Sequence, residues 1–209
     1  LDIYFHIRSE DSEPSLETGF TVRRVSTLTD SLGGAGNVFA NLCALGAGKV
    51  IPVGVIGADL FGQEMLRLMA GLQPSEYRLT VQRQGWTTPA YMKPIVDGKE
   101  QERIDTGVRN AVDGEVVRKL LADVRQALKT ADVVLINQQL EDTIYTDEFI
   151  AGLNELAREN PQIPFIVDSR TMQRRFKGMW HKLNTHEVAA ELGITLDPMQ
   201  SFLPADELR

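Results

Sequence analysis

The chain has 209 residues, and its 22 Lys and Arg against 29 Asp and Glu give a formal net charge of −7. An apolar fraction of 43% and a charged fraction of 24% are typical of a globular protein with a sizeable core, and they exclude wholesale disorder. The acidic balance excludes the basic face that nucleic-acid binders present to phosphates, so we expect no nucleic-acid partner. The single cysteine, Cys43, excludes an internal disulfide and a cysteine-rich zinc site.

The chain carries no targeting or membrane-spanning signal that we recognise. No apolar run approaches the roughly 18 to 20 residues that a membrane helix needs, and residues 1–8 are neither a signal peptide nor a transit peptide. We therefore expect a cytoplasmic protein without a membrane partner. Because the sequence opens without an initiator Met, we also expect it to be incomplete.

The first third of the chain predicts alternating strands and helices, which is the pattern of a parallel sheet covered by helices. The predicted strands are rich in β-branched or apolar residues, and the predicted helices show a 3.6-residue apolar period. The elements expected here are a strand at 20–28, a helix at 37–45 closed by Gly46, a buried strand at 50–55 and an amphipathic helix at 59–72.

The middle of the chain predicts a β lid. Residues 88–96 and 99–106 are two extended runs joined by Asp97-Gly98, a pair that suits the positive φ angles of a type I′ hairpin turn. Together with the N-terminal segment, this hairpin is expected to form a small sheet beside the main one. The predicted organisation is a lid of residues 1–24 and 86–106 and an α/β core of residues 25–85 and 107–209.

The second half returns to the α/β pattern, so the fold class we expect is α/β, a mostly parallel sheet flanked by helices, with a small β lid. The final predicted helix starts near Thr185 and ends by Gly193. The other elements expected in this half are helices at 113–129 and 146–159 and strands at 133–136 and 165–167.

The turn Gly33-Gly34-Ala35-Gly36-Asn37, between a predicted strand and helix, is a candidate ligand site. Its glycines let a ligand approach the backbone, and the free N–H groups of a helix start suit oxygen-rich ligands. The turn is not a P-loop, and Phe39 breaks the Gly-x-Gly-x-x-Gly pattern of dinucleotide-binding proteins. A tight structural turn explains these glycines about equally well.

Other polar residues have two readings each. Asn137 and Asp168 follow apolar strand runs, where the ends of parallel strands line a binding crevice, but loop or cap roles also fit them. Asn184 and Glu187 lie on one helix face and either reach a magnesium–phosphate cluster or form a capping box. The basic residues after Asp168 either meet a phosphate or are solvated; they are Arg170, Arg174, Arg175 and Lys177.

Taken in order, these segments resemble the ribokinase (PfkB) family of carbohydrate kinases. The run Leu32-Gly-Gly-Ala-Gly-Asn-Val-Phe-Ala-Asn-Leu-Cys-Ala-Leu-Gly46, continued by Val53-Gly-Val-Ile-Gly-Ala-Asp-Leu-Phe-Gly62, is similar to the family's N-terminal signature. Asn184-Thr-His-Glu187 matches its Asn-x-x-Glu motif. Arg103-Ile-Asp105 looks like a lid strand of the heptose-phosphate kinase branch, whereas Ile136-Asn-Gln-Gln-Leu-Glu141 is closer to the Gln-x-Glu type of sugar kinases at large.

The resemblance implies a three-layer ribokinase-like fold, a homodimer formed through the lid, and transfer of the γ-phosphoryl group of ATP, with Mg²⁺, to a hydroxyl of a sugar or sugar phosphate. The residues that it implies for sugar binding are Asp2, Gly33, Gly34, Asn37, Arg103 and Glu141. It implies that Asn184 and Asp168 bind the nucleotide and that Glu187 serves the metal.

The family's C-terminal Gly-Ala-Gly-Asp motif, whose Asp is the catalytic base, does not occur in this sequence. The resemblance therefore implies truncation at both ends, with the base beyond Arg209. Two other functions remain open: a non-catalytic sugar-binding homologue or fragment, and, on weaker grounds, a dinucleotide-dependent oxidoreductase, which needs the glycine pattern that Phe39 breaks.

Overall fold

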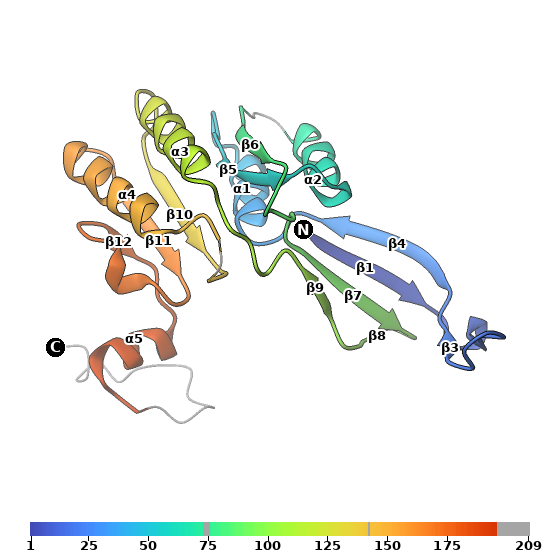
Figure 1. Cartoon of the computed structure of the whole chain (residues 1–209). Coiled ribbons are helices and arrows are strands. Elements are labelled where there is room, and N and C mark those ends of the chain that lie inside the picture. Colours follow the sequence, from blue (N-terminus) through green and yellow to red (C-terminus); the bar gives the residue numbers. More distant parts are fainter. Residues whose placement is uncertain (73–75, 142, 196–209) are drawn as a thin grey trace.

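The structure, a computed structural model, describes residues 1–72, 76–141 and 143–195, and it confirms the predicted α/β class with a β lid (Figure 1). The last residues assigned to the core by the sequence, 196–209, lie outside the described residues. None of the helices in the described ranges has the length and apolar character needed to cross a bilayer.

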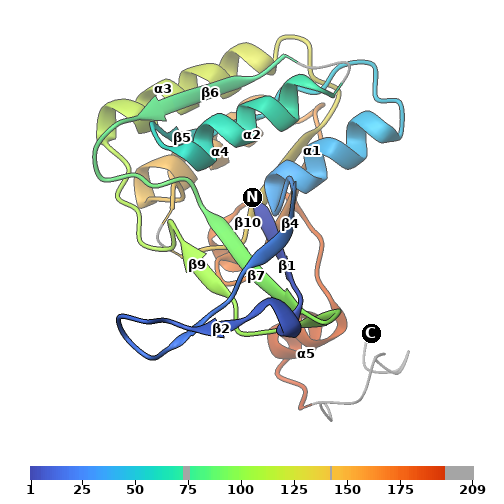
Figure 2. The same cartoon turned by 90° about the vertical axis from the view of Figure 1, so that its right-hand side faces the viewer.

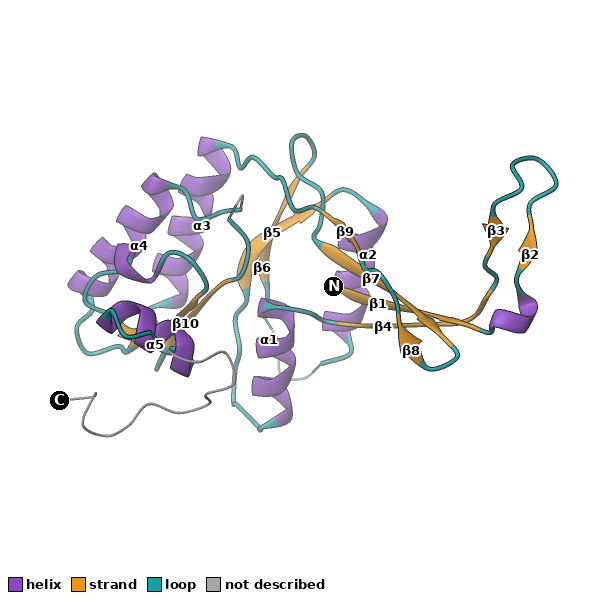
Figure 3. Ribbon diagram, turned by 90° about the horizontal axis from the view of Figure 1, so that it is seen from below, coloured by secondary structure: helices purple, strands orange, loops and turns teal. Residues whose placement is uncertain are grey.

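Five strands form one sheet, which we call the lid sheet. Its strand order is β4-β1-β7-β8, and β9 also pairs with β7. Figure 3 shows this sheet extending away from the helices, with the short β2–β3 hairpin beyond it. The strands of the lid sheet are β1 (Asp2–Ile7), β4 (Val25–Ser31), β7 (Ala90–Val96), β8 (Lys99–Glu100) and β9 (Ile104–Thr106), and those of the hairpin are β2 (Glu13–Pro14) and β3 (Thr21–Val22).

The predicted hairpin turn is confirmed. Asp97 and Gly98 have φ angles of 48° and 79°, and they connect β7 to the antiparallel β8. The strand expected at 20–28 differs from the structure, where β3 and β4 are separate and β4 runs on to Ser31. The reason is pairing: β4 follows the whole length of β1 in antiparallel register, from His6 opposite Thr27 to Asp2 opposite Ser31. The lid sheet thus includes residues 25–31, which the sequence assigns to the core.

The rest of the chain contains two parallel sheets covered by helices. Strand β5 (Val53–Gly57) pairs with β6 (Arg78–Gln82), and β10 (Val134–Gln138) pairs with β11 (Phe165–Ser169), which pairs with β12 (Trp180–His181). β6 and β12 have no counterpart among the predicted elements. The helices are α1 (Ala35–Ala44), α2 (Leu60–Ala70), α3 (Gly114–Ala127), α4 (Asp147–Glu159) and α5 (Thr185–Leu192), with 3-10 turns η1 (Ser9–Asp11) and η2 (Gln173–Arg175).

The main hydrophobic core lies where α3 and α4 pack against β10 and β11. Figure 2 shows α3 and α4 along the same side of the molecule. Their apolar residues recur every three or four positions, so each helix buries one face, and burying a large aliphatic side chain contributes about 1.5–3 kcal/mol. The buried residues are Val117, Leu120 and Val124 on α3, Phe149, Ile150, Leu153 and Leu156 on α4, and Ile136, Phe165 and Val167 on the strands.

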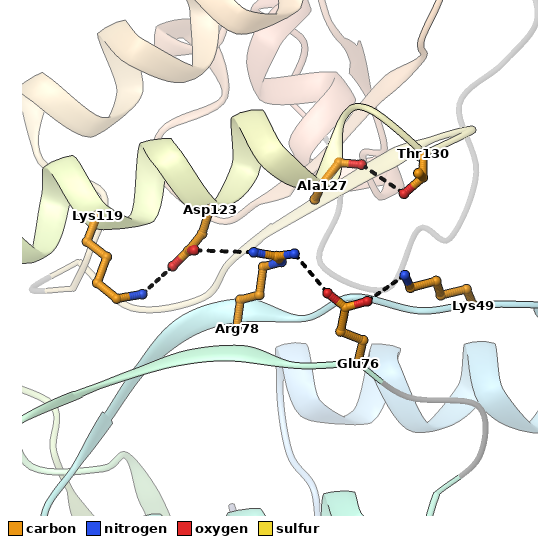
Figure 4. Close-up of polar contacts among 7 residues, drawn as sticks. All are labelled: Lys49, Glu76, Arg78, Lys119, Asp123, Ala127 and Thr130. Carbon is orange, nitrogen blue, oxygen red and sulfur yellow. Dashed lines mark hydrogen bonds and ion pairs between the residues drawn. The ribbon is translucent and has the colours of Figure 1, made fainter.

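A chain of alternating charges joins α3 to β6 (Figure 4). Lys119 Nζ lies 2.6 Å from Asp123 Oδ2, and Arg78 reaches Asp123 Oδ1 at 3.7 Å and Glu76 Oε1 at 2.8 Å. Lys49 pairs with Glu76 at the other end, and its hydrogen bond lowers the pKa of that carboxyl. Partly exposed ion pairs each contribute little stability. We therefore infer that this row of ion pairs mainly fixes how α3 lies across β6.

Candidate functional site

Asp2 is the second residue of the chain, and Figure 1 marks the N-terminus where the lid sheet meets the helices. It begins β1 and pairs in register with Ser31 of β4 and Tyr91 of β7. A β-carbon placed on Gly33 would lie 3.0 Å from Asp2 Oδ2, so the carboxylate lies directly against the backbone of the glycine turn. The structure thus brings together Asp2 and Gly33, two of the predicted sugar-binding residues.

The glycine turn continues into α1 with an unusual backbone. Gly34 is the N-cap of α1 and has φ 51° and ψ −125°, a conformation that side-chain-bearing residues rarely adopt. No side chain in the described part of the chain caps this helix. Gly34 and Asn37 are both exposed. Exposed backbone amides at a helix start, next to an amide side chain, suit an oxygen-rich ligand.

Lys93, which the sequence interpretation missed, pairs with Asp2. Its Nζ lies 3.0 Å from Asp2 Oδ1, donates to Tyr4 Oη at 3.4 Å, and lies 4.9 Å from the centroid of the Tyr4 ring. Burial opposes the charge, but the hydrogen bonds to Asp2 and Tyr4 and the charge of Asp2 outweigh it and raise the pKa of Lys93. The sequence feature that could have pointed to Lys93 is a lysine within a largely apolar predicted strand.

Arg103 directly precedes β9 of the lid sheet. Its guanidinium lies 4.5 Å from the centroid of the Tyr91 ring and donates through Nε and Nη2 to the two carboxylate oxygens of Asp105, at 2.6 and 2.7 Å. Burial and the charge of Asp105 raise the pKa of Tyr91, while the charges of Arg103 and Arg170 oppose the rise. Arg170 is the residue that follows β11.

Three further predicted residues, Asn137, Asp168 and Glu141, lie in or after β10 and β11. Asn137 and Asp168 are paired in register, and Asp168 lies 3.2 Å from Lys182 Nζ. The side-chain oxygen of Asn137 is buried and has no hydrogen-bond partner among the described residues. Glu141 is exposed in the loop after β10.

The capping box weighed from the sequence is present at the start of α5. Glu187 N donates to Asn184 Oδ1 at 2.9 Å, and Asn184 N donates to Glu187 Oε2 at 2.8 Å. Across the described ranges, no three His, Cys, Asp or Glu side chains gather closely enough to hold a metal ion. The nucleotide role of Asn184 and the metal role of Glu187 stay predictions. Of the basic residues near them, Arg174 pairs with Glu191 and Arg175 with Asp147.

The second half of the glycine signature has a structural role. Asp59 caps α2, accepting from Gly62 N at 2.7 Å, and its other oxygen accepts from Thr88 N at 2.8 Å. Thr88 Oγ1 in turn accepts from Gly57 N at 2.8 Å. This carboxylate therefore fixes the turn between β5 and α2 to the segment that leads into β7 of the lid sheet.

The chain is similar in sequence to curated bacterial proteins. The chain is 32% identical over 142 residues to the bifunctional protein HldE of Mesorhizobium japonicum, covering 68% of this chain and 28% of that protein. It is 33% identical over 187 residues to HldE of Caulobacter sp. strain K31, covering 87% and 36%. The chain thus spans about a third of the length of the HldE proteins it matches. No family model matches it.

Solved structures that resemble the chain include sugar and sugar-phosphate kinases. Phosphofructokinase-2 from Escherichia coli in complex with fructose-6-phosphate superposes with a TM-score of 0.66 at 17% identity, covering 100% of this chain and 64% of that one. Ribokinase from Giardia lamblia gives a TM-score of 0.52 at 18% identity, covering 84% and 54%. The chain therefore has the ribokinase-like fold, and its predicted resemblance to the ribokinase (PfkB) carbohydrate kinases is confirmed.

Proposed function

We propose that this chain provides the sugar-binding part of a carbohydrate kinase, which transfers the γ-phosphoryl group of ATP, with Mg²⁺, to a hydroxyl of a sugar or sugar phosphate. The observation that carries the proposal is the Asp2 carboxylate held against Gly33 where the lid sheet meets α1 of a ribokinase-like fold. Phosphoryl transfer depends mainly on positioning and charge neutralisation, so a fixed acceptor for a sugar hydroxyl is a central requirement.

The proposed roles follow from the chemistry of each group. The Asp2 carboxylate accepts hydrogen bonds from sugar hydroxyls, and the exposed Asn37 amide both donates and accepts. The other residues proposed for the sugar side are Gly33, Gly34, Arg103 and Glu141, and those proposed for the nucleotide and magnesium side are Asp168, Asn184 and Glu187.

We further propose that the lid sheet closes over the sugar and excludes water, which limits wasteful hydrolysis of ATP. A second proposal is a homodimer formed through the lid, because the lid sheet and the β2–β3 hairpin beyond it expose large apolar side chains to solvent. They include Leu28 and Ile104 of the lid sheet and Phe20 and Val22 of the hairpin. The proposed site of action is the cytoplasm, where ATP is abundant.

The test is a panel of sugars and sugar phosphates with ATP and Mg²⁺, with ADP release and sugar binding both measured on the purified protein. Asp2→Asn should weaken binding of the preferred sugar by roughly tenfold to a hundredfold, since it removes a charged hydrogen-bond acceptor. Asp132→Asn, an exposed carboxylate before β10, is the matched control and should change nothing.

The result separates the candidate functions. Sugar-dependent ADP release that Asp2→Asn abolishes or strongly reduces supports the kinase. Sugar binding without turnover supports the non-catalytic sugar-binding homologue, and equal binding by wild-type protein and Asp2→Asn contradicts the assignment of Asp2.

A further inference from the structure

The ion pair between Asp2 and Lys93 places a negative acceptor and a positive donor together at the proposed sugar site. The two side chains are only 20% and 17% exposed, and the joined atoms, Oδ1 and Nζ, lie 3.0 Å apart. The ammonium also lies 4.9 Å from the centroid of the Tyr4 ring and donates to the Tyr4 hydroxyl. Both charged groups are therefore held in one arrangement by neighbouring strands of the lid sheet.

We propose that Lys93 is a specificity-determining residue that, with Asp2, recognises two adjacent hydroxyls of the sugar. This inference rests on the proposed function and adds the substrate class: a sugar with a vicinal diol at this position. A hydroxyl both donates and accepts, so one hydroxyl of the diol donates to the Asp2 carboxylate and its neighbour accepts from Lys93. Adjacent hydroxyl oxygens on a sugar lie about as far apart as the two protein atoms.

The hydrogen-bond capacity of Lys93 supports this reading. An ammonium group carries three donors, and the described residues provide acceptors for two of them, Asp2 Oδ1 and Tyr4 Oη. The carboxylate of Asp2 has capacity beyond Lys93, because each of its oxygens accepts more than one hydrogen bond. Lys93 can therefore donate to a ligand, and Asp2 can accept from it, while the ion pair between them stays intact.

A purely structural ion pair is the competing explanation. Pairs of this kind that are removed from water are often replaceable by apolar residues without loss of stability, so the pairing alone does not explain why these residues are present. Sites that hydrogen-bond a substrate hydroxyl reject the analogue lacking it, because the buried group is left unpaired. The two explanations therefore differ in how a change at Lys93 affects discrimination between sugars.

The experiment measures dissociation constants by calorimetry for the preferred sugar and its monodeoxy analogues. For the wild-type protein, removal of either of two adjacent hydroxyls should weaken binding by roughly tenfold to a hundredfold. In Lys93→Met, the effect of removing one of these two hydroxyls should fall to near onefold, while the effect of removing the other persists. Lys99→Met, at an exposed position on β8, is the control and should leave all the ratios unchanged.

The opposite results are equally specific. If Lys93→Met weakens the sugar and all its deoxy analogues by one common factor, Lys93 is only structural and the inference is wrong, although the proposed function stands. If the wild-type protein binds no sugar, the proposed function and this inference fall together. Should Lys93→Met not fold, Lys93→Arg keeps the positive charge but places it differently. It should reduce discrimination at one of the two adjacent hydroxyls and not at the other, and unchanged discrimination at both overturns the inference.

Discussion

The helical core around α3 and the lid sheet are built from similar apolar residues, but only the lid sheet also leaves some of its large apolar residues more than half exposed. In the core, Leu120 and Leu156 are 0% and 1% exposed, whereas Leu28 and Ile104 of the lid sheet are 55% and 59% exposed. Free energy of unfolding comes mainly from removing apolar surface from water. The core therefore carries most of the stability, and the lid sheet is a low-stability element of the kind that binding sites use.

The largest effect expected is loss of a core side chain. Leu120→Ala should lower the free energy of unfolding by about 2–5 kcal/mol, because it removes a fully buried side chain and leaves a cavity. Leu28→Ala on the lid sheet should change it by less than about 0.5 kcal/mol. Urea denaturation of both variants measures the difference, and similar losses for the two would contradict the comparison.

The next effect tests the joint between β5, α2 and the lid sheet. Gly62→Ala places a β-carbon 2.4 Å from the Gly57 carbonyl oxygen, so it should destabilise the protein by about 1–3 kcal/mol, although alanine normally favours a helix. Gly48→Ala, where the new β-carbon would meet open space, is the control and should have little effect. Thermal unfolding of the two variants decides the matter, and a stabilised Gly62→Ala would contradict the close contact.

A third change tests the border of the core beside the site, where polar contacts replace apolar ones. Gln138 is fully buried; its Oε1 accepts from Ser169 Oγ at 2.7 Å and its Nε2 donates to the Leu140 carbonyl at 2.8 Å. Gln138→Leu leaves those partners without it and should lower the free energy of unfolding by about 1–3 kcal/mol. Gln63→Leu, at an exposed position on α2, is the control, and its change in the free energy of unfolding should be near zero in the same experiment.

The smallest effect concerns pH and the Asp2–Lys93 pair of the lid sheet. The folded-state pKa of Lys93 is raised, so its contribution to stability is complete below the ordinary value of 10.5 and is lost as pH rises through the folded-state value. The melting temperature of the wild-type protein should therefore approach that of Lys93→Met above about pH 10.5. A gap that stays constant from about pH 9 to about pH 12 would show that the charge of Lys93 contributes nothing.

The sequence predicted those parts of the fold whose signals are local. Helix α3 follows directly from the spacing of Val117, Leu120 and Val124, and the hairpin turn follows from Asp97-Gly98. The lid sheet was harder to predict, because β1 lies between β4 and β7, which come from distant parts of the chain. No local pattern specifies that pairing.

In the candidate site, too, motif residues were predicted from the sequence, whereas a contact between distant residues was not. Family resemblance supplied Asp2 and Gly33, and the structure brings them into contact. Lys93 escaped notice because its partner Asp2 is far away in sequence, and only the parallel register of β1 with β7 places them together. The sequence left Glu187 with two readings, and the capping box explains its position without excluding the metal role.

The position of Asp2 at the base of β1 has a mechanical consequence. β1 is six residues long, so its far end lies roughly 20 Å from the site, since a strand rises about 3.3 Å per residue. By geometry alone, any rotation of the sheet about the end that carries Asp2 would displace the far end of β1 much more than the proposed sugar site. Contacts made at that far end would therefore act on the proposed site with a large mechanical advantage.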